Sequence, residues 1–280
     1  MLARRARRVF GAPNPLQWLR SRGVRIEAVR DGAVRGEWVR AGGSGRGVVL
    51  YLHGGGYVAG SPITHRPITA ALARLTARPV FSLDYRLAPE HSFPAALDDA
   101  IEAYRWLLAG GVAPGMVAMA GDSAGGGLVL ATLLRARDEG IPLPGCAVCF
   151  SPWTDLAATG ASIERNNGRC SIFRPDNMAD FARLYLGGVS ARHPYASPLY
   201  ASLAGLPPLL FQVCGDELLL DDTRRVHEAV LDAGGRSTLE ITDGVFHGWQ
   251  MLDGLLPEAR TALQRAAAFI VLGAPARLSM

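Results

Sequence analysis

One glycine-flanked serine, in the stretch Met116–Leu130, constrains this chain more than any other feature. The stretch MVAMAGDSAGGGLVL is a short apolar run, then Gly121-Asp122-Ser123-Ala124-Gly125, then a helical pattern that opens with glycine. A serine in such a G-x-S-x-G sequence occupies a sharp strand-to-helix turn, where a strained backbone holds the hydroxyl out of the sheet. Side chains at the two flanking glycine positions would collide with the neighbouring strand and helix. The context predicts a strand, a tight turn and a helix, with Ser123 as a nucleophile.

An alternation of apolar strands and amphipathic helices surrounds this turn and predicts an α/β fold. The expected strands are Val48–Leu52, Val80–Asp84, Met116–Ala120, Cys146–Phe150, Leu209–Cys214 and Thr238–Thr242. The expected helices are Thr64–Ala77, Pro94–Leu108, Ser123–Glu139, Pro175–Leu186, Asp221–Ala233 and Pro257–Leu272. Strands that are apolar throughout are typical of a mostly parallel sheet with helices on both faces. The ligand site of such a sheet lies beyond the carboxyl ends of its strands.

The N-terminal segment predicts an arm followed by an edge hairpin. Val24–Val29 and Ala33–Val39 alternate in polarity around an Asp-Gly pair, which is typical of a β-hairpin and would add antiparallel strands at one edge. Residues 1–22 have helical spacing interrupted by prolines, so we expect an irregular arm with one short helix. No linker, repeat or low-complexity block divides the chain. We therefore expect residues 1–280 to form a single domain, with residues 23–280 as its core.

Composition limits the classes of protein to which the chain can belong. Of its 280 residues, 49% are hydrophobic and 19% are charged, which supports a sizeable core and argues against disorder. No apolar run approaches the ~18 residues that span a bilayer. The N-terminus is basic but is not followed by the apolar stretch of a secretory signal. We therefore expect a soluble, cytoplasmic protein with no membrane contact.

The positive charge is concentrated at one end of the chain. Residues 1–46 contain 11 Arg and 3 acidic residues, whereas residues 47–280 contain 18 Arg and 22 acidic residues. The formal net charge of +4 therefore comes from the N-terminal segment, which we expect to be a solvated arm. A nucleic-acid-binding protein would carry a basic stripe on its folded body, and the sequence does not predict one.

Cys146 and Cys149 have the C-x-x-C spacing of redox and metal-binding motifs. They lie in an apolar run that predicts a buried strand, where positions three apart point to opposite faces. No second cysteine pair lies nearby in the sequence to complete a zinc site. The sequence therefore predicts two small buried hydrophobic residues and no metal.

A glycine triplet follows the first core strand, in His53-Gly54-Gly55-Gly56-Tyr57. Glycines leave backbone N–H groups uncovered, so that a ligand oxygen can approach them closely. Acyl transfer needs such donors for the oxyanion of its tetrahedral intermediate. We expect the N–H groups of Gly55 and Gly56, with that of Ala124 after the serine, to form an oxyanion hole. His53 is expected to shape this loop.

A serine hydroxyl becomes an effective nucleophile when a base takes its proton. Among the six histidines, His247 follows the last expected strand, at a carboxyl end, and completes the chain order Ser…acid…His. The third member must be a carboxylate that orients the imidazole. Asp216 and Glu217 both follow the penultimate strand, and because adjacent residues point in different directions only one should reach His247. The residues themselves leave this choice open.

Several motifs together resemble the bacterial hormone-sensitive-lipase-like carboxylesterases. They are the His-Gly-Gly-Gly and Gly-Asp-Ser-Ala-Gly-Gly sequences, DYRLAPE at residues 84–90, SPWTDL at residues 151–156 and SPL at residues 197–199. The resemblance extends over residues 47–272. It implies an α/β-hydrolase fold with an eight-stranded mixed sheet and an N-terminal helical cap. It also implies small esters with short-to-medium acyl groups as substrates, and a homodimer formed through an edge strand.

The resemblance also favours one acid. Family members usually carry Asp-Pro-Leu-x-Asp at this position, with the first carboxylate catalytic and the second four residues further on. Glu217 and Asp221 have that spacing, whereas Asp216 would pair with Leu220. Glu217 is therefore the predicted acid, although a glutamate departs from the commonest family choice, and Asp216 is the alternative.

The expected reaction is hydrolysis of a carboxylic ester through an acyl-enzyme, without a metal or cofactor. The N-terminal segment is shorter than in many family members, which implies a reduced cap on which Trp18 and Leu19 face either the pocket or the core. Two other functions remain as alternatives: an amidase or peptidase with the same triad, and a non-catalytic ligand-binding module. The related modules lack the catalytic histidine, which this chain has. Five aromatic residues flank the motifs and could line the pocket or belong to the core: Tyr57, Trp153, Phe173, Tyr185 and Phe246.

Overall fold

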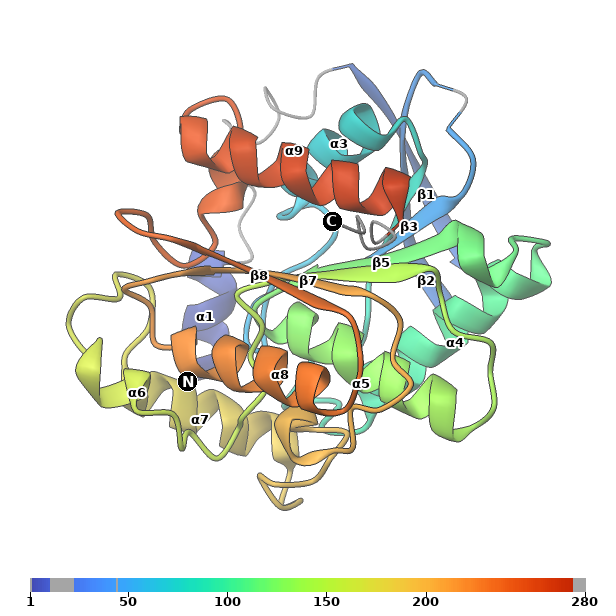
Figure 1. The fold of residues 1–280 in the computed structure, drawn as a ribbon. Coiled ribbons are helices and arrows are strands. Elements are labelled where there is room, and N and C mark those ends of the chain that lie inside the picture. Colours follow the sequence, from blue (N-terminus) through green and yellow to red (C-terminus); the bar gives the residue numbers. More distant parts are fainter. Residues whose placement is uncertain (1, 11–22, 44, 274–280) are drawn as a thin grey trace.

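A twisted sheet of eight strands forms the centre of the computed structural model, which describes residues 2–10, 23–43 and 45–273 (Figure 1). The strands are β1 Val24–Asp31, β2 Val34–Ala41, β3 Val48–Leu52, β4 Val80–Leu83, β5 Val117–Asp122, β6 Cys146–Phe150, β7 Leu209–Cys214 and β8 Ser237–Thr242. Their order across the sheet is β1-β2-β4-β3-β5-β6-β7-β8. β3 to β8 are parallel, whereas β2 is antiparallel to both β1 and β4. The expected mostly parallel sheet with a hairpin at one edge is confirmed.

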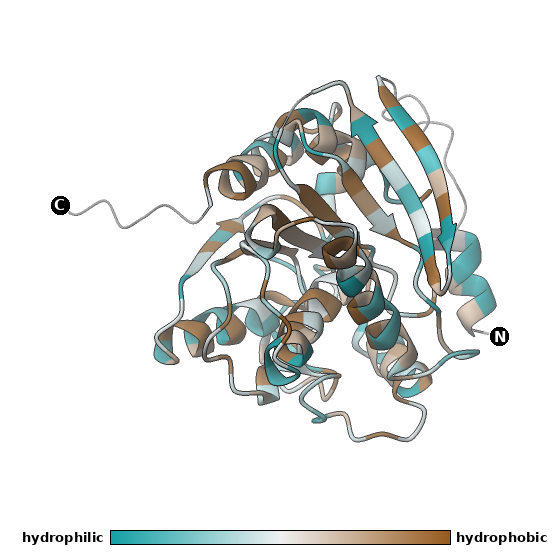
Figure 2. Ribbon diagram, turned by 90° about the vertical axis from the view of Figure 1, so that its right-hand side faces the viewer, coloured by the Kyte–Doolittle hydropathy of each residue, from teal (hydrophilic) through white to brown (hydrophobic). Residues whose placement is uncertain are grey.

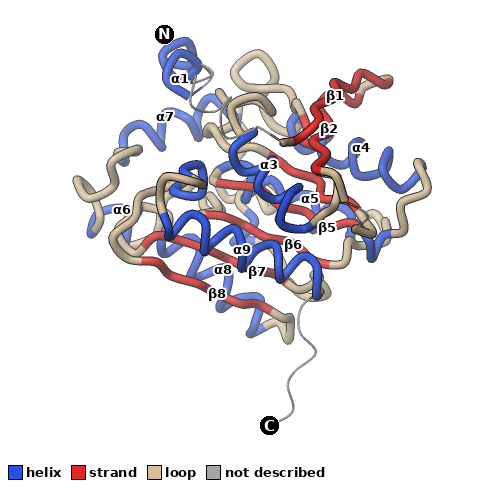
Figure 3. The backbone as a smooth tube through the Cα atoms, turned by 90° about the horizontal axis from the view of Figure 1, so that it is seen from above, coloured by secondary structure: helices blue, strands red, loops and turns tan. Residues whose placement is uncertain are grey.

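Helices cover both faces of this sheet. The longer ones are α1 Leu2–Phe10, α3 Arg66–Thr76, α4 Ala95–Ala109, α5 Ala124–Asp138, α7 Pro175–Leu186, α8 Leu220–Asp232 and α9 Pro257–Leu272, and α6 is a single turn at Ser162–Arg165. Short 3-10 turns lie at Pro114–Met116, Pro198–Tyr200 and Trp249–Leu252. α3 and α9 lie side by side across one face, and α4, α5 and α8 cover the other (Figures 1 and 3). Within the described ranges, no helix is long and apolar enough to cross a membrane.

The two faces of the sheet bury separate apolar clusters, because successive strand residues point to opposite sides. Leu50 and Cys149 belong to the cluster under α4, α5 and α8, whereas Val49 and Cys146 belong to the cluster under α3 and α9. Figure 2 shows that the central strands are continuously hydrophobic, whereas hydrophilic and hydrophobic residues alternate along the β1–β2 hairpin. The two cysteines therefore lie on opposite faces as expected, and all four cysteines of the chain are free.

The N-terminal helix α1 is docked on the body of the protein. Ala6 is buried in the main core cluster. Arg7 donates hydrogen bonds to the backbone oxygens of Val58 at 2.9 Å and Ala88 at 3.0 Å, and its guanidinium also pairs with Glu90. Arg4, Arg5 and Arg8 are exposed, as expected for a solvated arm, whereas Arg7 departs from that expectation because it has specific partners on the core. Trp18 and Leu19, the candidate cap residues, lie outside the described residues.

Candidate active site

Ser123 occupies the turn between β5 and α5. Its φ of 54° and ψ of −123° lie in a sparsely populated backbone region, which costs roughly 1–3 kcal/mol. The turn is held because Ser123 N–H donates to Phe150 O at 2.8 Å and Ser123 O accepts from Trp153 N–H at 2.9 Å. A Cβ at Gly125 would lie 2.0 Å from Leu52 O, so glycine is required there, as the sequence indicates.

The glycine triplet after β3 lies beside this turn. Gly55 and Gly56 have φ of 120° and 62°, and the N–H groups of Val58 and Ala59 donate to Gly55 O at 3.2 and 3.0 Å. A Cβ at Gly55 would lie 2.2 Å from Ala59 O, so the tight turn requires glycine there too. Because β3 and β5 are adjacent parallel strands, their carboxyl ends bring the triplet and Ser123 to the same edge of the sheet.

His53, at the start of this loop, is fully buried and stacks on Tyr85 with ring centroids 4.2 Å apart. Its Nδ1 lies 2.8 Å from Gly54 O. Burial, followed by the charge of His65, lowers the pKa of His53 to about 3. A neutral imidazole packed inside the loop supports the expectation that His53 shapes it.

His247 and Glu217 lie in contact beyond the carboxyl ends of β8 and β7. His247 Nδ1 lies 3.1 Å from Glu217 Oε1, and the two side chains are 7% and 1% exposed. Asp216 points outward instead: its side chain is 45% exposed and lies 3.4 Å from Arg169. Of the two adjacent carboxylates, Glu217 is therefore the one that faces the histidine.

Further hydrogen bonds fix the Glu217 side chain and the turn that carries it. Its Oε2 accepts from Ser151 Oγ at 2.8 Å and from Cys214 N–H at 3.2 Å. Asn166 Nδ2 donates to the backbone oxygen of Glu217 at 2.9 Å. Sequence reasoning assigns no role to Ser151 or Asn166. The only signal was that Ser151 opens the SPWTDL motif.

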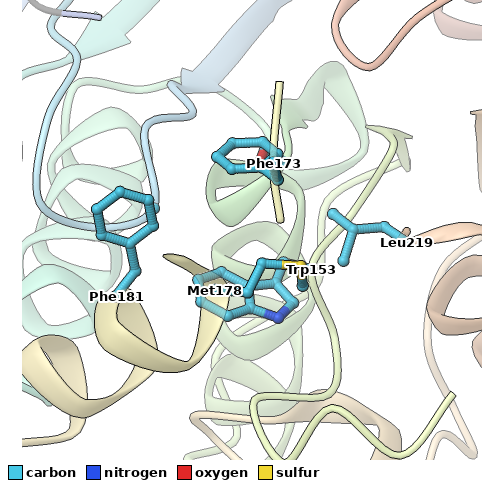
Figure 4. Close-up of a pocket in the computed structure, with 7 residues that line it drawn as sticks. Trp153, Phe173, Met178, Phe181 and Leu219 are labelled. Atoms are coloured by element: carbon cyan, nitrogen blue, oxygen red, sulfur yellow. The ribbon is translucent and has the colours of Figure 1, made fainter. Parts of the chain in front are cut away.

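A pocket opens beside Ser123 and Gly56. Figure 4 shows its apolar lining, with Met178 and Phe181 projecting from α7. The Phe173 ring, which also lines the pocket, packs edge-on against the His247 ring with centroids 5.0 Å apart. Phe173 therefore contacts the histidine and borders the same pocket as the serine. The full apolar lining is Trp153, Phe173, Met178, Phe181 and Leu219.

Only part of this lining can be read from the sequence. Trp153 and Phe173 are among the five flanking aromatic residues singled out above. Tyr57 and Tyr185, also singled out, are core residues that stack on each other with ring centroids 3.7 Å apart. Phe246 packs in a small cluster around buried Trp249. Nothing in the sequence distinguishes the other lining residues, because the apolar stripe of α7 predicts burial without saying what it faces.

Among the residues that the structure describes, no group of three or more His, Cys, Asp or Glu side chains is placed to hold a metal ion. The expectation that the protein needs no metal or cofactor stays a prediction.

The strand order, the strained serine turn and the glycine loop define an α/β-hydrolase. Residues 49–251 match a protein family described by the alpha/beta hydrolase fold, and the chain belongs to that family. It is 46% identical over 244 residues to an acetyl-hydrolase of Streptomyces hygroscopicus, which covers 87% of this chain and 82% of that relative.

Solved structures agree with this assignment. A crystal structure of an esterase from the bacterial hormone-sensitive lipase family has a TM-score of 0.89 and 41% identity, over 98% of this chain and 97% of that one. The esterase EstE5, in a crystal soaked with p-nitrophenyl butyrate, has a TM-score of 0.88 and 40% identity, over 98% and 99% of the two chains. The comparisons confirm the expected fold, the resemblance to hormone-sensitive-lipase-like esterases and the assignment to ester hydrolases.

Proposed function

We propose that the protein is a serine carboxylesterase with Ser123 as nucleophile, His247 as general base and Glu217 as the acid that orients the histidine. The observation that carries this proposal is the buried 3.1 Å contact between His247 Nδ1 and Glu217 Oε1, beside a pocket that contains a strained serine. A carboxylate at Nδ1 holds the imidazole in the tautomer whose Nε2 can accept a proton. The N–H groups of Gly55, Gly56 and Ala124 form the proposed oxyanion hole.

The chemistry proceeds in two half-reactions. Ser123 Oγ attacks the ester carbonyl carbon while His247 takes the hydroxyl proton, and the carbonyl electron pair moves to the oxygen that faces the three N–H groups. Collapse of this intermediate expels the alcohol, protonated by His247, and leaves an acyl-serine. Water then gives a proton to His247 as it attacks the acyl carbon. The second collapse releases the carboxylic acid and returns the proton to Ser123, while Glu217 stabilises the imidazolium at both stages.

The pocket beside Ser123 supports short-to-medium acyl groups as substrates. It is apolar and bordered by aromatic rings, which suits the methylenes of an acyl chain. One relative is an acetyl-hydrolase and the structurally similar EstE5 was soaked with a butyrate ester, which agrees with this size range.

Labelling and a substrate panel test the proposal together. The purified protein should hydrolyse p-nitrophenyl acetate and butyrate, and phenylmethylsulfonyl fluoride should add one sulfonyl group to Ser123, located by peptide mass spectrometry. Ser123→Ala should abolish both. Hydrolysis of p-nitroanilides with the same acyl groups tests the amidase alternative. These amides should react far more slowly than the p-nitrophenyl esters. An intact fold with no adduct at Ser123, or full esterase activity in Ser123→Ala, would overturn the proposal.

We also propose a cytoplasmic homodimer that hydrolyses small soluble esters. Four free cysteines support a reducing compartment. β8 is an edge strand on which Ile241 is 39% exposed, and it supports pairing through this edge. Light scattering of the purified protein tests the dimer, and Ile241→Lys should then produce a monomer. A monomeric wild-type protein would contradict it.

A further inference from the structure

The carboxylate of Asp122, the residue before Ser123, connects three separate segments of the site. Its Oδ1 accepts hydrogen bonds from Gly54 N–H at 2.9 Å and from Tyr51 OH at 2.6 Å. Its Oδ2 lies 3.3 Å from His65 Nε2. One buried side chain therefore links the end of β3, the glycine loop and the residue that precedes α3.

The contact between Asp122 and Gly54 bears on catalysis because Gly54 directly precedes the proposed oxyanion donors. Gly55 and Gly56, the next two residues, carry two of these donors. Preorganised donors stabilise developing charge only when they are aimed at the position that the oxyanion will occupy. Since Asp122 is bonded to Gly54 and is adjacent in sequence to Ser123, it links the loop directly to the nucleophile.

The surroundings of the Asp122–His65 pair favour its ionised form. Burial alone would raise the pKa of Asp122, but the charge of His65 and the hydrogen bonds from His65 and Tyr51 lower that pKa to about 2. Burial alone would lower the pKa of His65, but Asp122 and the carbonyl of Ser61 raise it above its ordinary value.

Polar groups contact both ring nitrogens of His65. Nδ1 lies 2.9 Å from Thr64 Oγ1 and 3.2 Å from Ser61 O, while Nε2 lies beside Asp122 and is placed to donate to its carboxylate. A positive charge immediately before a helix is disfavoured by the helix dipole, and the Asp122 carboxylate offsets that cost. The neighbouring His53 ring, 5.4 Å away by centroids, is neutral.

We propose that Asp122 and His65 are positioning residues for catalysis, which hold the oxyanion-hole loop against the serine turn. This inference rests on the proposed esterase function. Neither side chain is required to touch the substrate; Asp122 acts through Gly54 N–H, and His65 holds the carboxylate in place and balances its charge.

Two substitutions test the pair: Asp122→Asn, which removes the charge but retains an oxygen for Gly54 N–H, and His65→Gln, which retains a donor but removes the cation. Loss of a whole oxyanion donor costs ~10²–10³ in rate. Oxyanion donors that are present but less well oriented should cost less than a missing donor. We therefore expect kcat for p-nitrophenyl acetate to fall about 10-fold or more, with KM within about 3-fold of wild type. Affinity for a trifluoromethyl ketone, which mimics the tetrahedral intermediate, should fall in proportion to kcat/KM.

Glu37→Gln is the matched control. Glu37 is 5% exposed and makes hydrogen bonds of 2.9 and 2.7 Å with Arg66 at the start of the same helix, on the side of β2. This variant should lower the melting temperature but leave kcat unchanged. If Asp122→Asn and His65→Gln are folded and have kcat within twofold of wild type, or if Glu37→Gln lowers kcat equally, the inference is wrong.

Two measurements on the wild-type protein keep the test decisive should either variant fail to fold. The imidazole ¹⁵N shifts of His65 should show the cation at pH 7, and a neutral ring would overturn the ion pair. Sulfonylation of Ser123 separates this inference from the proposed function. An unlabelled wild-type serine defeats the esterase proposal, whereas normal labelling and unchanged kcat in the variants defeat only the positioning role.

Discussion

Ser151 Oγ donates a 2.8 Å hydrogen bond to Glu217 Oε2, which joins the loop after β6 to the turn after β7. The other carboxylate oxygen of Glu217 then faces His247. Ser151 is buried and has a φ of 46°, an uncommon conformation for a non-glycine residue. Ser151 and the N–H group of Cys214 thus hold one oxygen of the carboxylate, and the other oxygen remains for the histidine.

Ser151→Ala should therefore lower kcat. A hydrogen bond to a charged group contributes about 1.5–3 kcal/mol, and if most of it orients Glu217, kcat for p-nitrophenyl butyrate should fall about 10-fold with little change in KM. Steady-state kinetics measure both constants. Ser197→Ala is a matched control, because Ser197 is also buried but its hydroxyl bonds to the backbone atoms of Leu156 and Ala191. Equal kcat values for the two variants would contradict a role for Ser151.

Glu217→Gln and Asp216→Asn distinguish the two adjacent carboxylates. An amide beside His247 Nδ1 favours the wrong tautomer, and the corresponding change in a well-studied triad costs ~10⁴ in kcat. We expect a loss of roughly 10³–10⁴ for Glu217→Gln and a kcat near that of wild type for Asp216→Asn, whose side chain points outward. Kinetics with p-nitrophenyl acetate measure both. The reverse pattern would assign the acid to Asp216.

Much of the fold could be predicted because it is determined by local sequence patterns. Five-residue apolar runs such as Val48–Leu52 and Cys146–Phe150 have the bounds expected for buried parallel strands. The turn at Ser123 could be predicted equally well, because the glycines at fixed positions beside it indicate a backbone path where side chains would collide with neighbouring segments. The strand ends then indicated where the candidate site residues would lie.

The remaining features depend on contacts between distant segments, which no local pattern records. Glu217 and Asp216 differ only in the direction that each side chain takes after the strand. Met178 and Phe181 form an ordinary apolar stripe, and they border the pocket because α7 lies beside the serine turn. Arg7 looked like part of a solvated arm because its partner, Glu90, is more than eighty residues away in sequence.

Phe181→Ala should shift the preference toward longer acyl chains. Phe181 is 5% exposed and borders the pocket beside Ser123, so removal of its ring lengthens the space for the acyl group. Each methylene that gains an apolar contact contributes about 1–3 kcal/mol to discrimination. We expect the ratio of kcat/KM for octanoate over butyrate p-nitrophenyl esters to rise about 10-fold or more.

The control for this change is Phe269→Ala, a similar truncation on α9, which covers the other face of the sheet. Large-to-small core changes of this kind cost about 3–5 kcal/mol of stability, so both variants should melt at lower temperature. Only Phe181→Ala should alter the chain-length profile. An unchanged profile in that variant would show that the acyl group lies elsewhere.

Asp222, a fully buried carboxyl group on α8, should make stability depend on pH. Its Oδ2 accepts from the N–H groups of Thr154 and Asp155 at 2.9 and 2.8 Å. Burial raises its pKa to about 8, and the charge of Asp155 adds to this effect, while the two backbone donors and Arg225 oppose it. In the unfolded chain an aspartate titrates near ~3.9. Between about pH 4 and pH 8 the folded state therefore binds more protons than the unfolded state, and stability falls as pH rises through this window.

Asp222→Asn removes the titrating proton and should flatten this slope. Compared with wild type, the variant should become relatively more stable from pH 5 to pH 9. The measurement is the difference in melting temperature between the two proteins at each pH, because this difference cancels the titration of the groups that they share. Thr223→Val is the control: it removes the buried hydroxyl that donates to Leu219 O on the same helix, and should lower stability equally at every pH because it exchanges no proton. A constant difference between wild type and Asp222→Asn across this range would mean that Asp222 is ionised in the folded protein throughout.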